Sequence, residues 1–458
     1  MLHLRQQPWQ TSLPAPDGSC YHLCIASTNS EKYKVVVMSL SELRRSVVQR
    51  LSLEEELALI RRGAEEIFPE EELVDKLKRS RAEGRPLRVK LGVDPTASEL
   101  HLGHLIPVLK LAQFQQLGHQ AVLIIGDYTA MVGDPTNRKK ARPQLTHEQT
   151  LANAANYTRH FFRFLDPALT EVVHNGQWFS KMTFADVINL MSRMTLARML
   201  EREDFQQRWK AELPISLHEL VYPLMQGYDS LQVRADVELG GIDQKFNILV
   251  GRDLQKEAGL EPQVGVCNPI LIGLDGKEKM SKTAGNYIAL TDSPEDMYGK
   301  TMSIPDELMM QYFELVTTVS LEELEQLRRG LADGTIHPRD AKRRLAREIV
   351  KRFYSEEAAW AAEEHFDKVH RQREIPDDVP EFVLRPEQLE GGRIWIVRLL
   401  VEAGLASTNS EARRLISQGG VRIDGAVIND PNLDWEPKTG AVVQVGRRRF
   451  ARIVVAGD

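Results

Sequence analysis

Residues 88–104, RVKLGVDPTASELHLGH, constrain the fold of this 458-residue chain more than any other stretch. Their valines and leucine alternate as in a strand, a turn follows, and leucines with helical spacing begin at Leu102. A helix that opens directly after a strand presents free N–H groups and the positive end of its dipole to a ligand. His101 and His104 share one face there, and Gly103 lets a ligand approach the backbone. The stretch therefore predicts a nucleotide site that binds a polyphosphate.

A second stretch, KMSKT at 279–283, supports this interpretation of the histidine pair. Alone, His-x-x-His is also typical of a metal pair or of surface histidines, although no Cys or third His lies near it in sequence. Lys279 and Lys282 follow a turn-rich segment, and two such lysines on a mobile loop can neutralise charge that develops on pyrophosphate. A lysine-rich loop alone is usually solvated surface. In this order and at this separation, the two stretches resemble the two ATP motifs of class I aminoacyl-tRNA synthetases.

The chain around the first stretch predicts a parallel sheet. The apolar run at 121–126, AVLIIG, indicates a buried strand beside the first one, and a crossover helix over 105–117 would join them. This unit predicts an α/β fold with a Rossmann-like doubly wound parallel sheet, in which ligands bind at the carboxyl ends of the strands. The residues at these ends are Gly92, Asp94, Gly126 and Asp127.

Three other segments place polar side chains where a ligand can use them. Asp134 beside a proline is most often a turn or capping residue, but at a strand end its carboxylate can also bind an amino-acid ammonium. Polar residues on one face of a predicted helix at 220–230 favour a small polar ligand, with a solvated face as the alternative: Tyr222, Gln226 and Asp229. Asp243 and Gln244 follow a Gly-Gly pair after a strand-like start and can accept hydrogen bonds from ribose hydroxyls.

Composition narrows the class of protein. Apolar residues make up 42% and charged residues 27% of the chain, which is ordinary for a soluble globular protein of two or three domains. The 3 cysteines cannot build a disulfide framework, so a reducing cytoplasm is expected. No apolar run reaches membrane-spanning length, and the net charge of -6 argues against a surface coated for nucleic acid.

The chain is expected to contain several parts. Residues 1–40 are interpreted as a disordered tail, with an organelle transit peptide as the alternative and Met38 as a hypothetical internal start. Residues 39–85 are interpreted as two helices. The expected parts after the tail are a Rossmann-like catalytic domain at 41–290, an all-helical domain at 291–372, a linker at 373–390 and a small α+β domain at 391–458.

The last part carries a local positive charge. Residues 391–458 contain 10 basic and 7 acidic residues, a net charge of +3 in a chain that is negative as a whole. Their helices and hairpin resemble the RNA-binding domain named after the fourth small-subunit ribosomal protein. The candidate phosphate contacts, each of which has a solvated surface as its alternative, are Arg413, Arg414, Arg422, Arg447 and Arg448.

From about residue 50 to the end, the sequence resembles the bacterial-type tyrosyl-tRNA synthetases. The resemblance implies that the catalytic residues are Thr96, His101, His104, Lys279 and Lys282. It implies a tyrosine site that consists of Asp134, Tyr222, Gln226, Asp229 and Gln244. In this site Asp229 would contact the phenol hydroxyl, and Gln244 would lie near the reacting carboxylate. It implies ATP contacts by Gly92, Asp94, Gly103, Gly241, Asp243, Ser281, Thr283, Arg138 and Arg142.

The activity that the resemblance implies is attachment of tyrosine to tRNA(Tyr) in two steps through tyrosyl-adenylate. ATP is then a substrate, Mg²⁺ a helper, and a homodimer forms through an insertion in the catalytic domain; no metal site in the protein is implied. The alternatives are a tryptophanyl-tRNA synthetase, in which Asp229 would face an indole ring, and a catalytically dead RNA-binding paralogue, against which the intact motifs argue.

The sequence departs from the family pattern at three positions. Lys90 stands where many members have a second tyrosine facing the phenol, so it either pairs with Asp229 or points away from the pocket. Ile242 stands where a serine is commoner, and the second ATP motif ends in Thr283 instead of a serine. Recognition of the hydroxyl is therefore expected to depend on Asp229 and on partners that the sequence does not identify.

Overall fold

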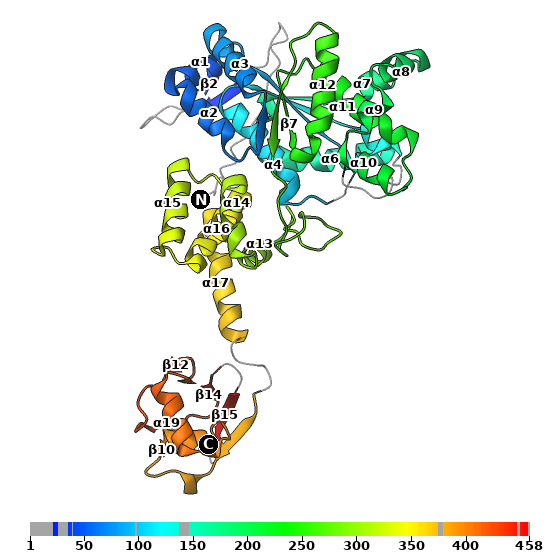
Figure 1. Cartoon of the computed structure of the whole chain (residues 1–458). Coiled ribbons are helices and arrows are strands. Elements are labelled where there is room, and N and C mark those ends of the chain that lie inside the picture. Colours follow the sequence, from blue (N-terminus) through cyan, green and yellow to red (C-terminus); the bar gives the residue numbers. More distant parts are fainter. Residues whose placement is uncertain are drawn as a thin grey trace, which may run out of the picture. The chain divides into compact units, whose positions relative to one another are not determined.

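The strand and helix predicted within residues 88–104 lie at the centre of a six-stranded sheet. The structure, a computed structural model, describes residues 22–25, 35–38, 40–96, 99–136, 146–373, 379–446 and 449–456. The chain divides into two compact units, Met1–Ala359 and Trp360–Asp458, and helix α17 (Glu356–Arg373) spans the boundary (Figure 1).

The sheet of the first unit has the strand order β3-β8-β7-β4-β5-β6, and only the β3–β8 pair is antiparallel. The chain moves outward from β4 through β5 to β6 and then restarts at β7 on the other side of β4. The predicted doubly wound sheet is confirmed, and its switch in strand order lies between β4 and β7. The strands are β3 (Glu66–Phe68), β4 (Arg88–Val93), β5 (Gln120–Ile125), β6 (Thr170–His174), β7 (Val237–Gly241) and β8 (Val264–Asn268).

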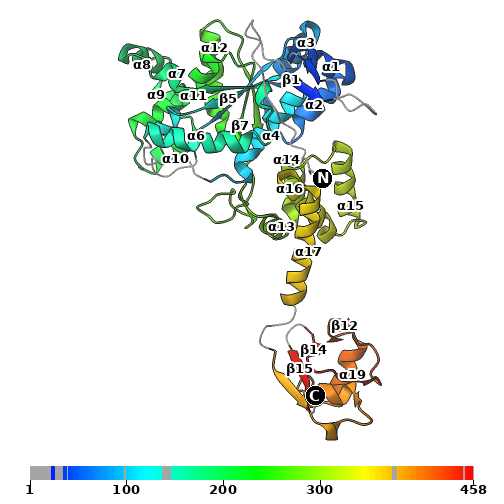
Figure 2. The same cartoon turned by 180° about the vertical axis from the view of Figure 1, so that it is seen from behind.

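Helices connect the parallel strands on both faces of the sheet. Helix α4 (Leu102–Gln116) joins β4 to β5, while α12 (Lys245–Glu257) joins β7 to β8 in the opposite direction. Because such crossovers are right-handed, the two helices cover opposite faces (Figures 1 and 2). The other helices here are α5 (Thr129–Val132), α6 (His147–Phe161), α7 (Gly176–Phe179), α8 (Phe184–Met191), α9 (Leu196–Met199), α10 (Glu203–Lys210) and α11 (Tyr222–Gln232).

The segment before β4 differs from the two helices predicted for residues 39–85. It forms three helices and the edge strand β3, because Ser52 caps a new helix and ends the first one early. In the predicted tail, β1 (His22–Ile25) pairs with β2 (Val35–Met38), so disorder was the wrong prediction for these two segments. The rest of residues 1–39 lies outside the described residues. The three helices are α1 (Leu40–Arg50), α2 (Leu53–Arg61) and α3 (Glu70–Glu83).

A buried charge network fixes these helices to the sheet. Glu56 of α2 accepts hydrogen bonds from Arg44 of α1 and Arg81 of α3. His119, which precedes β5, accepts the N–H of Leu87 at Nδ1, so its Nε2 carries the proton donated to Glu56. Burial favours the neutral acid, but the bonds from His119 and Arg44 prevail and lower the pKa of Glu56 to about 2.

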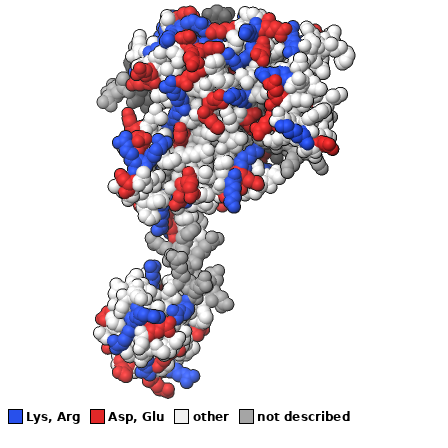
Figure 3. Space-filling view, in the orientation of Figure 1, with Lys and Arg blue, Asp and Glu red and all other residues white. Residues whose placement is uncertain are grey.

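The segment predicted to be all-helical is helical in the structure. Pro338 occupies the first turn of α16 (Pro338–Phe353), as predicted, since a missing N–H costs nothing at that position. The helices before it are α13 (Pro294–Met302), α14 (Met309–Val316) and α15 (Leu321–Asp333). Figure 3 shows acidic and basic side chains interspersed over the surface of the first unit, in keeping with the small net charge of the whole chain.

The second unit is an α+β fold, as predicted. Its sheet has the order β12-β11-β14-β15-β9, packed with α18 (Ile396–Glu402) and α19 (Asn409–Ser417) around one apolar core. The expected linker at 373–390 contains β9 (Glu381–Leu384), which pairs in parallel with β15, so part of that range belongs to the sheet. The other strands are β10 (Ile394–Trp395), β11 (Val421–Ile423), β12 (Ala426–Val427), β13 (Asp434–Trp435), β14 (Val442–Val445) and β15 (Arg449–Val455).

Replacing Glu56 with glutamine should lower the free energy of unfolding of the first unit by about 3 kcal/mol at pH 7, because Arg44 would keep its buried charge without a carboxylate. The pKa of Glu56 is lower in the folded chain than in the unfolded one. Its contribution is therefore complete above the unfolded pKa and is lost as the pH falls through about 2. Urea denaturation at several pH values measures this, with the exposed neighbour Glu55→Gln as the control. Equal losses in the two variants would contradict the prediction.

Candidate active site

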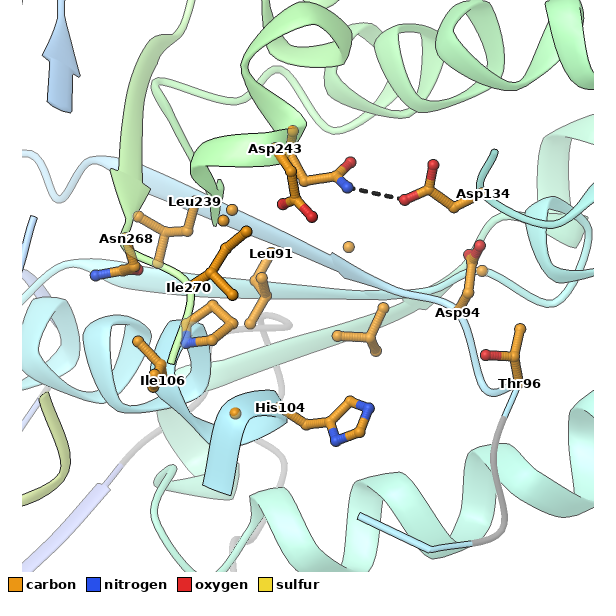
Figure 4. A pocket seen from close by; sticks show the side chains of 18 of the residues that line it. Leu91, Asp94, Thr96, His104, Ile106, Asp134, Leu239, Asp243, Asn268 and Ile270 are labelled. Carbon is orange, nitrogen blue, oxygen red and sulfur yellow. Dashed lines mark hydrogen bonds between the residues drawn. The ribbon is translucent and has the colours of Figure 1, made fainter. Parts of the chain in front are cut away.

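Most of the predicted site residues line one cavity of about 510 Å³ beside the carboxyl ends of β4 and β7 (Figure 4). They come from six separate segments, which the switch in strand order brings together. These residues are Gly92, Asp94, Thr96, His101, Gly103, His104, Asp134, Tyr222, Gln226, Asp229, Gly241, Asp243, Gln244, Lys279, Ser281, Lys282 and Thr283. Arg138 and Arg142 lie outside the described residues.

The two histidines stand at the N-terminus of α4 with their ring centroids 3.9 Å apart. The backbone N–H of His101 donates to Nδ1 of His104 at 3.3 Å, which leaves the proton of the His104 ring on Nε2. Burial lowers the pKa of His101 to about 3, and repulsion from His104, once that ring is protonated, and from Lys279 acts in the same direction. At neutral pH the ring of His101 is therefore an uncharged N–H donor. Gly103 makes room for it, because a Cβ there would lie 3.1 Å from that ring.

The lysine loop is tied to the same helix end by main-chain hydrogen bonds. Leu102 donates to the carbonyl of Ile288 at 3.0 Å, and Leu290 donates to Leu100 at 2.9 Å. The side chain of Lys282 forms an ion pair with Glu99 at 2.9 Å, in the turn before α4. Sequence reasoning did not identify Glu99, since nothing in its neighbourhood marks one carboxylate of a polar turn as the partner of a lysine far along the chain.

Asp229 is a buried residue that lines the cavity. The indole Nε1 of Trp178 donates to Oδ1 at 3.0 Å, and the amide of Asn175 donates to Oδ2 at 3.1 Å. Burial raises the pKa of Asp229 to about 7, although the charge of Lys90 and these two donors oppose the shift. The sequence analysis missed Asn175 and Trp178. Asn175 directly follows β6, so recognition of that strand would have placed it at the carboxyl edge.

Lys90 pairs with Glu238 and not with Asp229, which answers the question left by the sequence. Its ammonium is fully buried and pairs with Glu238 at 2.7 Å, and it also donates to Ser230 and to the carbonyl of Gln226. The lysine thus belongs to a polar network beneath the cavity. Its charge still acts through space, because it lowers the pKa that burial alone would give Asp229.

Two more carboxylates of the cavity are held by hydrogen bonds. Asp134 accepts from the backbone and hydroxyl of Thr136, from Arg202 at 3.1 Å and from Gln244 at 2.8 Å, the bond drawn in Figure 4. Burial opposes ionisation of Asp134, but the charge of Arg202 and the other donors leave its pKa below the ordinary value. Asp94 accepts the phenol of Tyr222 at 2.9 Å, so its carboxylate orients that ring hydroxyl.

The cavity can therefore hold a ligand with several kinds of charge. Neutral N–H donors and lysines gather near the start of α4, where phosphates would be favoured. The ionised Asp134 suits an ammonium, and the carboxylate of Asp229 suits a hydroxyl donor. Among the described residues, no group of three or more His, Cys, Asp and Glu side chains is placed to hold a metal ion.

The predicted RNA contacts lie in the second unit. Arg413 and Arg414 are on α19 and Arg422 is on β11, while Arg447 and Arg448 lie outside the described residues. The guanidinium of Arg413 lies 5.1 Å from the centre of the Trp395 ring. In the part of the chain that the structure describes, no helix is both long and apolar enough to span a membrane.

Comparison with known proteins gives consistent results for both units. The family described as tRNA synthetases class I (W and Y) matches residues 82–371, and the S4 domain matches residues 394–434. The tyrosine–tRNA ligase of Moorella thermoacetica is 56% identical over 398 residues, covering 87% of this chain and 95% of the relative. The tyrosine–tRNA ligase of Thermotoga maritima is 52% identical, and the match covers 87% of this chain and 97% of the relative. The solved structure of tyrosyl-tRNA synthetase from Archaeoglobus fulgidus with L-tyrosine is 26% identical, with a TM-score of 0.56 over 68% of this chain and 99% of that one.

Proposed function

The chain belongs to the bacterial-type tyrosyl-tRNA synthetases of class I, and from this premise we propose how its own residues perform the reaction. Its activity is that of a tyrosine–tRNA ligase with ATP as substrate. The observation that supports the proposal best is one cavity that is lined by both ATP motifs and by the buried Asp229.

Tyrosine is proposed to bind with its ammonium at Asp134, which is ionised because Arg202, Thr136 and Gln244 donate to it. Its phenol O–H would donate to Asp229. Tyr222 and Gln226 line the wall between these two carboxylates, and they complete the proposed amino-acid site. An indole N–H can also donate to a carboxylate, as Trp178 does to Asp229 here, so the assignment of tyrosine over tryptophan rests on the relatives named tyrosine–tRNA ligases.

The first step joins a carboxylate oxygen of tyrosine to the α-phosphorus of ATP and breaks the bond to the β-phosphate oxygen, releasing pyrophosphate. No side-chain nucleophile is needed. The protein supplies positioning and donors: Gln244 near the reacting carboxylate, Asp243 at the ribose, and donors to the phosphates from Thr96, His101, His104, Lys279 and Lys282. The proposed substrate is MgATP, in which phosphate oxygens and water would be ligands of the ion.

Lys282 has to leave its partner before it can contact a phosphate. Its ammonium is paired with Glu99, and both side chains are partly exposed, so exchanging this ion pair for a pyrophosphate oxygen costs little. We propose that the lysine loop moves in this way when ATP binds. The basic residues Arg138 and Arg142, by the resemblance, would add charge at the same end.

In the second step, the terminal ribose hydroxyl of tRNA(Tyr) takes the tyrosyl group from the adenylate and AMP leaves. The second unit supplies the proposed RNA contacts, including Arg413, Arg414 and Arg422, which lie on α19 and β11. A match to the S4 domain at 394–434 supports this role.

A cytoplasmic location is also proposed, because the buried Cys267 is a free thiol.

We propose a homodimer formed by the segment between β6 and α11. Large apolar side chains are exposed there, among them Phe184 (80%), Trp209 (63%) and Leu217 (81%), and such exposure marks contact surfaces. Sedimentation should give twice the chain mass for the wild type and for the control Val427→Glu, which alters an exposed residue of β12. The double variant Phe184→Glu and Leu217→Glu should sediment as a monomer. A dimer that survives this change would contradict the proposed interface.

The activity is tested by ATP–pyrophosphate exchange with tyrosine, with tryptophan and with no amino acid. Exchange should require tyrosine, and dependence on tryptophan would overturn the assignment of substrate.

A chain that ends at Arg373, before β9, should keep tyrosine-dependent exchange while aminoacylation of tRNA falls, because the removed residues hold RNA contacts and neither ATP motif. Parallel loss of both activities would show that the second unit is needed for chemistry.

The affinity for tyrosine should depend on the protonation of Asp229. With a pKa of about 7, its carboxyl becomes neutral below that pH and accepts the phenol hydrogen bond less strongly. The KM for tyrosine should therefore rise as the pH falls through 7, while the KM for ATP serves as the internal control. Asp229→Asn should remove this pH dependence and raise the KM for tyrosine roughly 10- to 100-fold. It should also reduce the preference for tyrosine over phenylalanine. An unchanged preference would mean that the hydroxyl is read elsewhere.

A further inference from the structure

Arg202 is a buried cation that joins the segment between β6 and α11 to the amino-acid site. It precedes α10, and its side chain is 4% exposed. Its three nitrogens have separate partners: Nε pairs with Asp204 at 2.8 Å, Nη1 donates to Asn247 at 3.0 Å, and Nη2 donates to Asp134 at 3.1 Å. A guanidinium has donors only, so each partner must present an acceptor to it.

The contact with Asp134 acts on one of its two oxygens. Oδ1 accepts from Arg202 and from the backbone and hydroxyl of Thr136, while Oδ2 accepts from Gln244. Since a carboxylate offers about two acceptor sites on each oxygen, Oδ1 is saturated and Oδ2 has capacity left. The arrangement thus directs one oxygen of Asp134 toward a cationic ligand.

The contact with Asn247 fixes the direction of a chain of amides. Because Arg202 holds Oδ1 of Asn247, the NH₂ of that amide must point the other way, where it donates to Gln226 and Gln244 at 2.9 Å each. Both glutamines then accept through oxygen, so their NH₂ groups donate to carboxylates. Gln226 donates to Glu238 at 3.1 Å, and Gln244 donates to Asp134 at 2.8 Å.

We propose that Arg202 is a positioning residue for the amino-acid site: its two terminal nitrogens hold Asp134 and Asn247, and through Asn247 they orient Gln226 and Gln244. The inference rests on the proposed function, which it deepens. It also means that the segment with the exposed apolar side chains contacts the proposed tyrosine pocket through buried Arg202, in addition to Asn175 and Trp178 at Asp229.

Arg208 provides a matched control on the same helix. It is as buried as Arg202, at 3% exposure, and both of its terminal nitrogens bond to Glu219, at 2.7 and 2.9 Å. Its side-chain hydrogen bonds go to Glu219 and to the carbonyl of Pro214, neither of which lines the cavity, whereas Arg202 bonds to Asp134, which does. A substitution at Arg208 therefore reports what loss of a buried guanidinium does to stability alone.

The experiment compares full-length wild type, Arg202→Gln, Arg202→Lys, Arg208→Gln and Arg208→Lys in tyrosine-dependent pyrophosphate exchange. The readouts are the KM for tyrosine, the KM for ATP, and inhibition by 3-(4-hydroxyphenyl)propionate, which lacks the ammonium. Arg202→Gln should raise the tyrosine KM at least about tenfold with the ATP KM nearly unchanged, because a charge-assisted hydrogen bond network is lost. Its preference for tyrosine over the desamino inhibitor should shrink by a similar factor.

Arg202→Lys keeps a charge beside Asp134 but has one nitrogen where the guanidinium has two in a fixed fork. It should keep most of the preference for the ammonium while the tyrosine KM still rises, and both Arg208 variants should lose thermal stability without changing either quantity. If Arg202→Gln loses stability as Arg208→Gln does but keeps wild-type constants, Arg202 is only structural and the proposal fails. If Arg202→Gln does not fold, a wild-type tyrosine KM in Arg202→Lys overturns it. A wild type that shows no tyrosine-dependent exchange would instead refute the proposed function.

Discussion

Two main-chain hydrogen bonds, Leu102 to Ile288 and Leu290 to Leu100, hold the site together. They fasten the chain after the lysine loop to the N-terminus of α4, so the two ATP motifs share one cavity although they are far apart in sequence. Backbone bonds of this kind tolerate many side chains, because they depend only on the path of the chain. In the lysine loop that precedes them, the side chain of Lys282 is paired with Glu99 of the turn before α4.

The sheet beneath this junction explains why the cavity forms there. The strand order reverses between β4 and β7, so the loops that follow these strands diverge and leave space above their carboxyl ends. One side of the space receives the start of α4 with its N–H groups, and the other receives the polar side chains of α11 and η3 (Ile242–Gln244). A ligand with a polyphosphate at one end and an amino acid at the other fits this division of charge.

The proposed amino-acid end contains buried charged groups that are paired with one another. Lys90 with Glu238, and Arg202 with Asp134, would each be costly as isolated charges, and each is satisfied by several hydrogen bonds. Asp229 is different, because its donors only partly offset its burial and its pKa rises to about 7. A buried carboxylate with a raised pKa is typical of a functional site, and the hydroxyl of a bound ligand would supply one more donor to it.

The sequence alone determined the local elements and the kinds of chemistry. Alternating valines gave the strand before Asp94, helical spacing put Tyr222, Gln226 and Asp229 on one face, and the two short motifs marked the phosphate end. The roles of these residues remain a prediction. Only the tertiary structure decided which side chains meet: that Lys90 turns to Glu238, that Asn175 and Trp178 donate to Asp229, and that Arg202 holds Asp134. The physical reason is that periodicity and turn chemistry act over a few residues, whereas a buried polar group is satisfied by whichever distant segment the packing brings within hydrogen-bond distance.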